Sequence, residues 1–163
     1  MSASGPVESP RFLADVMLGR LARWLRVLGF DTAYDPTATD PQLVSRAAAE
    51  GRVLLTRDRH LLRELRPARA LEIYSDAPLD QLRQVVGAFA LSAPVELFTR
   101  CLICNEPLSP VAEAERETLV PEAARRLPGP VRRCPHCRRV YWAGSHARRM
   151  RAALDRALPG WLR

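Results

Sequence analysis

The sequence predicts an α/β fold, in which a parallel sheet with helices on both faces is followed by a small four-cysteine module. Short apolar segments alternate with amphipathic helices over residues 11–91, a pattern typical of parallel sheets. All four cysteines come after this region, as two CxxC pairs. The 163 residues suit one domain and a smaller module. We expect a loose tail over residues 1–10, the α/β domain over 11–96 and the cysteine module over 97–163.

Each expected element of the α/β domain has its own local pattern. The strands are short, unbroken apolar runs, whereas the helices have apolar residues at helical spacing. Gly29 and Gly51 stand where two of the helices should end. Asp40 followed by Pro41 predicts the start of a helix, with the aspartate as N-cap. The expected strands are 12–14, 32–34, 53–56 and 70–74, and the expected helices are 17–28, 40–50, 59–65 and 78–91.

The spacing of the cysteines indicates a zinc site. Cys101 pairs with Cys104 and Cys134 with Cys137, and residues 105–133 separate the two pairs. Four thiolates form the tetrahedral ligand set that Zn²⁺ prefers. Two structural disulfides or a redox CxxC are the alternatives, but the chain shows neither a secretion signal nor a thioredoxin-like context. We therefore expect a zinc ribbon that depends on its metal for much of its stability.

The ribbon has few other structural patterns. Between the cysteine pairs, a proline-rich stretch without sustained periodicity predicts an inserted arm. After the second pair, an apolar run predicts a strand, and Ser145 is a suitable cap for a last helix. The expected elements are a short helix at 121–127, a strand at 140–142 and a helix at 145–158.

The net charge lies entirely in the ribbon. Residues 1–96 contain 12 arginines and 12 acidic residues, whereas residues 97–163 contain 13 arginines and 6 acidic residues, which accounts for the net charge of +7. A cationic module suggests a polyanionic partner, and nucleic acid is favoured over a membrane because no amphipathic anchor is present. No apolar run is long enough to span a bilayer, and residues 1–10 show no signal peptide, so we expect a cytoplasmic protein.

Aspartates follow the expected strands. Asp15, Asp58 and Asp76 come directly after a strand or after its last polar residue, and Asp40 begins the helix after the second strand. Because the carboxyl ends of parallel strands share one edge, we expect the four carboxylates to converge there. Such a cluster suits Mg²⁺ or Mn²⁺, which can activate water to hydrolyse a phosphodiester. The alternative is that each aspartate only caps a helix. The residues after Asp15 offer no special reason for a cap.

Three segments of the chain carry a resemblance to a known family. They are FLADVMLGRLARWLR at residues 12–26, LLTRD at 54–58, and the cysteine pairs together with VYWAGSH at 140–146. Over residues 11–150 the chain resembles the Mut-seven C-terminal RNase-domain family. The resemblance implies a PIN-like nuclease domain followed by a zinc ribbon, with a metal-dependent ribonuclease site. The acidic positions of PIN-like nucleases correspond here to Asp15, Asp40 and Asp58, with Asp76 as a fourth.

Cationic and aromatic side chains are the candidates for RNA contacts. Arginines close to the acidic edge in sequence suit phosphate binding, and an aromatic ring in the cationic ribbon suits stacking on a base. The alternative for the arginines is a solvated surface. The candidate RNA-binding residues are Arg23, Arg26, Arg57, Arg138, Arg139, Trp142 and His146.

The sequence thus predicts a cytoplasmic ribonuclease that hydrolyses RNA phosphodiester bonds. A catalytic Mg²⁺ or Mn²⁺ would be held by Asp15, Asp40 and Asp58, and a structural Zn²⁺ by the four cysteines. RNA is the expected partner, and no membrane is expected. The alternative function is that of a non-catalytic RNA- or ribosome-binding zinc-ribbon protein.

Overall fold

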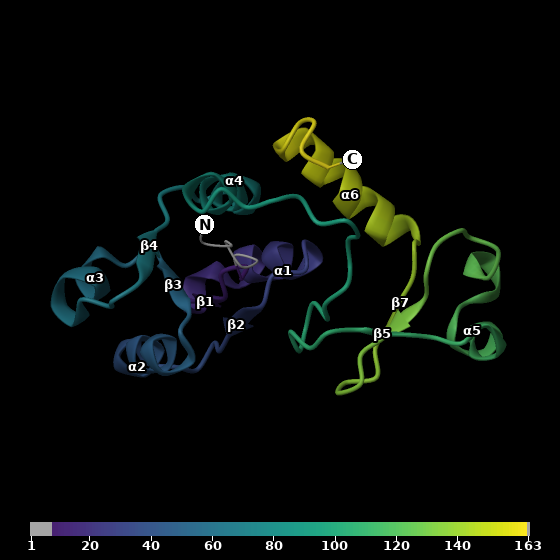
Figure 1. Cartoon of the computed structure of the whole chain (residues 1–163), viewed down its shortest axis with the longest axis horizontal. Helices are drawn as coiled ribbons and strands as arrows, with labels where there is room; N and C mark the ends of the chain where they lie inside the picture. Colours follow the sequence, from purple (N-terminus) through teal and green to yellow (C-terminus); the bar gives the residue numbers. More distant parts are fainter. Residues whose placement is uncertain (1–7, 163) are drawn as a thin grey trace, which may run out of the picture. The chain divides into compact units, whose positions relative to one another are not determined.

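The computed structural model describes residues 8–162, so residues 1–7 of the expected tail lie outside the described residues. The chain divides into two compact units (Figure 1). Of the described residues, the first unit contains 8–22 and 30–92, and the second contains 23–29 and 93–162. Helix α1 (Gly19–Val27) therefore contributes its first residues to one unit and its last residues to the other.

The first unit is built on a four-stranded sheet in the order β2-β1-β3-β4. All neighbouring strands are parallel, which confirms the predicted α/β fold. The strands are β1 (Phe12–Ala14), β2 (Thr32–Tyr34), β3 (Val53–Thr56) and β4 (Ala70–Glu72), and the helices besides α1 are α2 (Asp40–Glu50), α3 (Arg59–Leu65) and α4 (Pro78–Ala88).

Helices flank the sheet, and successive strand residues supply the core on opposite faces. On one face, the phenyl ring of Phe12 packs edge-on against Phe30 and against Phe89 after α4, with ring centroids 6.3 and 5.4 Å apart. Phe12 is fully buried, which contributes about 1.5–3 kcal/mol. The other face packs on α2 and α3 through Leu13, Ala33, Leu43, Ala47, Leu54 and Leu61.

Two helix starts differ from the sequence predictions because of local hydrogen bonds. The helix expected from residue 17 opens as a 3₁₀ turn, η1 (Val16–Leu18), since the Asp15 carboxylate accepts a hydrogen bond from the backbone N–H of Met17. The expected N-cap role of Asp40 is wrong. Thr39 is the N-cap of α2, and it exchanges hydrogen bonds with Gln42 in a capping box.

Two elements of the first unit end earlier than expected. Strand β4 ends at Glu72, two residues before the predicted end, because the backbone N–H of Tyr74 donates to the side-chain oxygen of Gln84. Helix α4 ends at Ala88, shortly before Ala90, which adopts a positive φ of 46°.

In the part of the chain that the structure describes, none of the helices has the length and apolar character that a membrane span requires.

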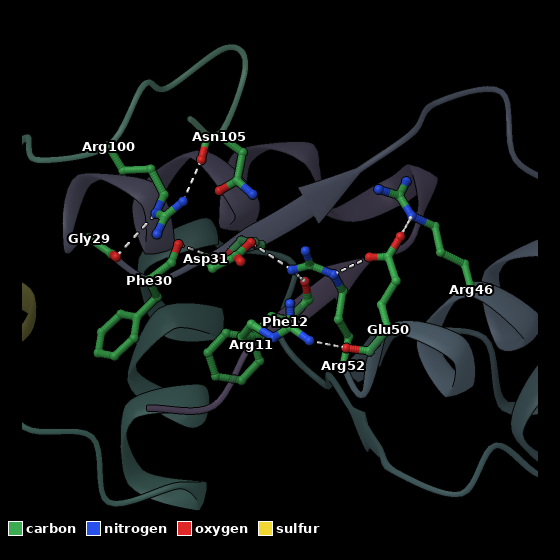
Figure 2. Close-up of polar contacts among 11 residues, drawn as sticks. Arg11, Phe12, Gly29, Phe30, Asp31, Arg46, Glu50, Arg52, Arg100 and Asn105 are labelled. Carbon is green, nitrogen blue, oxygen red and sulfur yellow. Dashed lines mark hydrogen bonds and ion pairs between the residues drawn. The ribbon is translucent and has the colours of Figure 1, made fainter. Parts of the chain in front are cut away.

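A buried arginine fixes the amino-terminal end of the sheet (Figure 2). Arg52 donates hydrogen bonds to the carboxylates of Asp31 and Glu50, at 2.6 and 2.5 Å, and to the carbonyl oxygen of Phe12 at 3.2 Å. Asp31 directly precedes β2, Phe12 begins β1 and Arg52 directly precedes β3. One guanidinium group therefore connects the starts of three strands.

The second unit has a small antiparallel sheet in the order β5-β6-β7. The arm contains a helix that the sequence does not predict, α5 (Glu113–Leu119). None of its residues is buried. Helix α6 begins after Gly144, and no side chain caps it, so the expected Ser145 cap is wrong. The elements are β5 (Ser109–Pro110), α5 (Glu113–Leu119), η2 (Glu122–Ala124), β6 (Arg132–Arg133), β7 (Val140–Tyr141) and α6 (Ser145–Ala157).

We predict that Arg52→Leu lowers the free energy of unfolding of the first unit by about 2–4 kcal/mol, because it leaves two partly buried carboxylates without their partner. Urea unfolding at neutral pH measures this change. The matched control is Arg46→Leu, which removes a half-exposed ion pair with the same Glu50 and should cost less than about 1 kcal/mol. Equal effects of the two variants would contradict the role assigned to Arg52.

The contact between Arg52 and Glu50 also predicts that the stability of the first unit depends on pH. The hydrogen bond from Arg52, and then that from Arg46, hold the pKa of Glu50 below its ordinary value of 4.5. This contribution to stability is present above that value and is lost as the pH falls through the lowered pKa. The difference in unfolding free energy between the wild type and Arg52→Leu should therefore shrink on acidification below pH about 4.5.

Candidate functional site

The four cysteines come together in the second unit. The sulfur atoms of Cys101, Cys104, Cys134 and Cys137 all lie within 4.8 Å of one another, and those of Cys101 and Cys137 are 3.7 Å apart. A disulfide would need about 2 Å. Tetrahedral Zn²⁺ with its usual sulfur distances sets neighbouring sulfurs roughly 3.8 Å apart. The predicted grouping of the cysteines at metal-binding distance is confirmed, and the donor set fits zinc.

The two CxxC turns repeat one backbone geometry. The N–H of Cys104 donates to the sulfur of Cys101 at 3.3 Å, and the N–H of Cys137 donates to the sulfur of Cys134 at 3.4 Å. The residue after each pair adopts a left-handed conformation, with φ of 67° and 66°. Hydrogen bonds from backbone N–H groups stabilise the thiolate form that a metal ligand requires.

Tyr141 supports the metal site from β7. Its hydroxyl lies 3.2 Å from the sulfur of Cys101 and accepts a hydrogen bond from the N–H of Leu102 at 3.0 Å. Burial opposes ionisation of Cys101, but the hydrogen bonds to its sulfur, led by that of Tyr141, lower its pKa to about 7. Burial, together with this bond, raises the pKa of Tyr141, so its hydroxyl remains a donor. Sequence spacing gave no indication of this contact.

Two of the predicted catalytic aspartates are connected at the carboxyl edge of the first unit's sheet. The register pairs Ala14 with Leu55, which sets Asp15 beside Thr56. The Thr56 hydroxyl donates to Oδ2 of Asp15 at 2.5 Å and accepts the backbone N–H of Asp58 at 3.0 Å. One buried threonine therefore fixes the carboxyl ends of β1 and β3 together with both aspartates.

Both aspartates also cap helices. Oδ1 of Asp15 accepts from the N–H of Met17 at 2.9 Å, and Oδ1 of Asp58 accepts from the N–H groups of His60 and Leu61 at 2.8 and 3.1 Å. The expectation that Asp15 has no reason to cap is therefore wrong. Each cap uses Oδ1, however, and a carboxylate has about four lone-pair positions. Capping is thus compatible with binding a cation.

The other two aspartates lie apart from this connection. Asp76 has a side chain that is 90% exposed and forms an ion pair with Arg57 at 2.5 Å. Asp40 is exposed in the first turn of α2. Within residues 8–162, the cysteines are the only His, Cys, Asp or Glu donors that gather as three or more within 4.8 Å. The four aspartates therefore do not form a compact cluster of that size.

A carboxylate that was not among the predicted ligands lies at the same edge. The register pairs Ala14 with Tyr34, so Asp35 follows β2 as Asp15 follows β1. The hydroxyl and the N–H of Thr37 donate to Oδ1 of Asp35 at 2.7 and 2.9 Å and lower its pKa. The pattern that could have identified Asp35 is its position directly after the strand 32–34.

The predicted RNA-binding arginines near the acidic edge in sequence have different surroundings. Arg26 is buried, and its guanidinium donates to the carbonyl oxygens of Leu102 and Ile103 in the first CxxC turn, at 2.9 and 3.2 Å. It therefore supports the fold of the second unit. Arg57 is the partner of Asp76.

The remaining predicted RNA-binding residues lie in the second unit. Arg138 is exposed and occupies the left-handed position after the second cysteine pair. The others line one pocket with a volume of about 260 Å³, and they are Arg23, Arg139, Trp142 and His146.

Comparison with known families gives one match. A family model described as the Mut7-C RNAse domain matches residues 10–154. The matched range contains all four predicted catalytic aspartates and all four cysteines. No curated protein and no solved structure matches the chain.

We predict that the purified protein contains one zinc ion per chain and that Cys137→Ala loses it, because three thiolates no longer complete the tetrahedron. Cys137 is the exposed member of the set, so its substitution leaves the buried ligands in place. Elemental analysis after dialysis measures the loss. The control is His136→Ala, which changes an exposed neighbour inside the same turn and should retain zinc. Zinc retained in Cys137→Ala would contradict the four-cysteine site.

Proposed function

Because this chain belongs to the Mut7-C RNAse domain family, we propose that it is a metal-dependent ribonuclease that hydrolyses RNA phosphodiester bonds. The observation that carries the proposal is the connection of Asp15 and Asp58 through Thr56 at the carboxyl edge of a parallel sheet. In open α/β sheets, ligands bind along this edge. Residues 11–96 would supply the PIN-like catalytic domain and residues 97–163 the RNA-binding ribbon.

Asp15, Asp40 and Asp58 are the proposed ligands of a catalytic Mg²⁺ or Mn²⁺, with Asp76 assisting. Mg²⁺ usually keeps several waters and takes one or two carboxylates together with substrate phosphates. Thr56 holds the carboxylate of Asp15 and the backbone N–H of Asp58, so the chain offers two carboxylates at this edge, which fits this chemistry without a compact four-acid cluster. When bound, such an ion activates water and offsets the charge that develops on the phosphodiester. Asp35 lies close to this pair by register and is a further candidate.

The chain's own residues hold this edge ready for substrate. Asp15 is buried, and its carboxylate accepts hydrogen bonds from Met17 and from the side chain of Thr56, so its orientation is set before RNA arrives. Arg57 follows Thr56 directly, and its ion pair with Asp76 keeps a guanidinium group at the same edge. We assign Arg57 to binding of a substrate phosphate, for which a planar guanidinium is well suited.

The ribbon is proposed to hold a structural zinc and to contribute RNA binding. Four uncrosslinked thiols at metal distance suit a reducing compartment, which supports a cytoplasmic location. The net charge of +7 in this part of the chain supports contact with the RNA backbone.

The second candidate function is a non-catalytic RNA- or ribosome-binding protein. It is supported by the capping contacts of Asp15 and Asp58, which would suffice to explain both aspartates. Caps and metal ligands differ in what they require. A cap needs a hydrogen-bond acceptor, which asparagine also offers, whereas the metal site needs negative charge.

We predict that Asp58→Asn lowers Mn²⁺-dependent RNA cleavage by more than about a hundredfold. The stability of the variant should change by less than about 0.5 kcal/mol, because Asn caps a helix about as well as Asp. Cleavage of a labelled RNA and urea unfolding measure the two effects. Asp80→Asn is the matched control, since Asp80 is an exposed aspartate in the first turn of α4 and should leave cleavage unchanged.

Asp58 gives a cleaner test than Asp15. Both carboxylate oxygens of Asp15 accept hydrogen bonds, so an amide would turn an N–H group toward a donor and cost about 1–3 kcal/mol. If Asp58→Asn retains full cleavage, the carboxylate is a cap alone and is rejected as a metal ligand. A folded wild type without Mn²⁺-dependent cleavage would favour the non-catalytic function.

A further inference from the structure

A pocket of about 260 Å³ lies in the second unit, beside the first CxxC turn and the start of α6. Its lining residues all belong to that unit, including the one that α1 contributes. It contains aromatic, aliphatic and cationic side chains. We call it the Trp142 pocket and define it by Arg23, Ile103, Arg139, Trp142, Ser145 and His146.

The charged side of this pocket favours an anion. A guanidinium nitrogen of Arg23 lies 3.4 Å from Nε2 of His146, and Arg139 lines the same pocket. Among the described residues that line it, none is acidic. Two arginines with a histidine and without a carboxylate form a site in which a phosphate would offset the local charge.

The apolar side of the pocket favours a flat ring. Ile103 is 54% exposed, although it is a large aliphatic side chain. The indole of Trp142 lies directly against Gly144, where a Cβ atom would be only 2.7 Å from the indole nitrogen. The glycine therefore permits this close approach. The indole also packs against the cluster of Val120, Ala124 and Val131, so contacts within the second unit orient the ring before any ligand binds. A ring fixed in advance loses little conformational entropy when a base stacks on it.

We propose that the Trp142 pocket binds one unpaired nucleotide of RNA. The base lies against Trp142 and Ile103, and the phosphate lies at Arg23, Arg139 and His146. The volume suits one nucleotide, and a base within a duplex is already stacked and cannot present its face to the indole. This inference rests on the proposed function for its ligand class, and it adds that the ribbon selects single-stranded segments.

The test compares single-stranded and duplex RNA. The full-length, zinc-loaded protein is titrated into a labelled short oligouridylate and into an RNA duplex, without Mg²⁺ or Mn²⁺ so that no cleavage occurs. Trp142→Leu should weaken binding of the oligouridylate about tenfold and leave duplex binding within about twofold. Arg139→Gln should weaken binding of the oligouridylate and lower its salt slope by about one.

The control is Arg149→Gln, which removes the same charge from an exposed position of α6 outside the pocket. It should change the affinity for either RNA by less than about twofold. His146→Gln provides a second pocket variant at an exposed helical position, where folding is retained if Trp142→Leu fails to fold. It should weaken binding of the oligouridylate and spare the duplex. Zinc content verifies the fold of each protein.

Oligouridylates with a 5′-phosphate and with a 5′-hydroxyl distinguish the two sources of the phosphate. If the pocket variants lose affinity equally for both oligouridylates, the pocket binds an internal nucleotide. If they lose affinity only for the 5′-phosphorylated one, the pocket binds the 5′ end of the RNA.

The proposed nucleotide site is rejected if folded pocket variants bind the oligouridylate like the wild type, or if they lose affinity equally for the oligouridylate and the duplex. A separate cleavage assay with Mn²⁺ reports on the proposed function. A wild type that cleaves RNA while its pocket variants bind normally rejects the pocket alone.

Discussion

The parallel register of β1, β2 and β3 is the constraint on which the proposed active site depends. Because Ala14 is level with both Tyr34 and Leu55, the next residue of each of the three segments stands in one row. That row contains Asp15, Asp35 and Thr56, which are far apart in sequence. The Thr56 hydroxyl then links Asp15 to the backbone of Asp58. A slip of one residue in β3 would turn the hydroxyl to the other face of the sheet and break this link.

The second unit depends on a different constraint, because it has little apolar sequence to bury. The arm between the cysteine pairs has a core of only three buried residues among those described, namely Val120, Ala124 and Val131. The cysteine cluster compensates, since metal binding converts ligand bonds into folding free energy. Arg26 adds to this from α1 by donating to carbonyl oxygens of the first CxxC turn. The end of α1 is thereby part of the second unit.

Local patterns predicted most of the first unit's elements, and the features that they missed have different physical causes. Apolar runs define the strands 12–14, 32–34 and 53–56 locally, and the structure has them at these bounds. The helix 40–50 also agrees with the structure, because a proline near its start and a left-handed glycine after its end define it. Thr39 replaced Asp40 as the cap because its partner Gln42 completes a capping box. Helix α5 was missed because it buries no residue and so has no apolar stripe. The cysteine cluster followed from spacing, whereas the contacts of Arg26 and Tyr141 cross long stretches of sequence and leave no local pattern.

Asp15 shows why structural and chemical roles are difficult to separate at such a site. Its carboxylate starts η1, receives the Thr56 hydroxyl and stands at the edge where a cation would bind. Each hydrogen bond to the carboxylate restricts its conformations already in the folded protein. Binding of a metal ion or substrate then costs less conformational entropy. A cap at a strand end is therefore a suitable starting point for a ligand, because it holds one oxygen and leaves the carboxylate its charge. In Asp58 the cap occupies Oδ1 alone, and for that reason charge and hydrogen bonding can be separated at this residue.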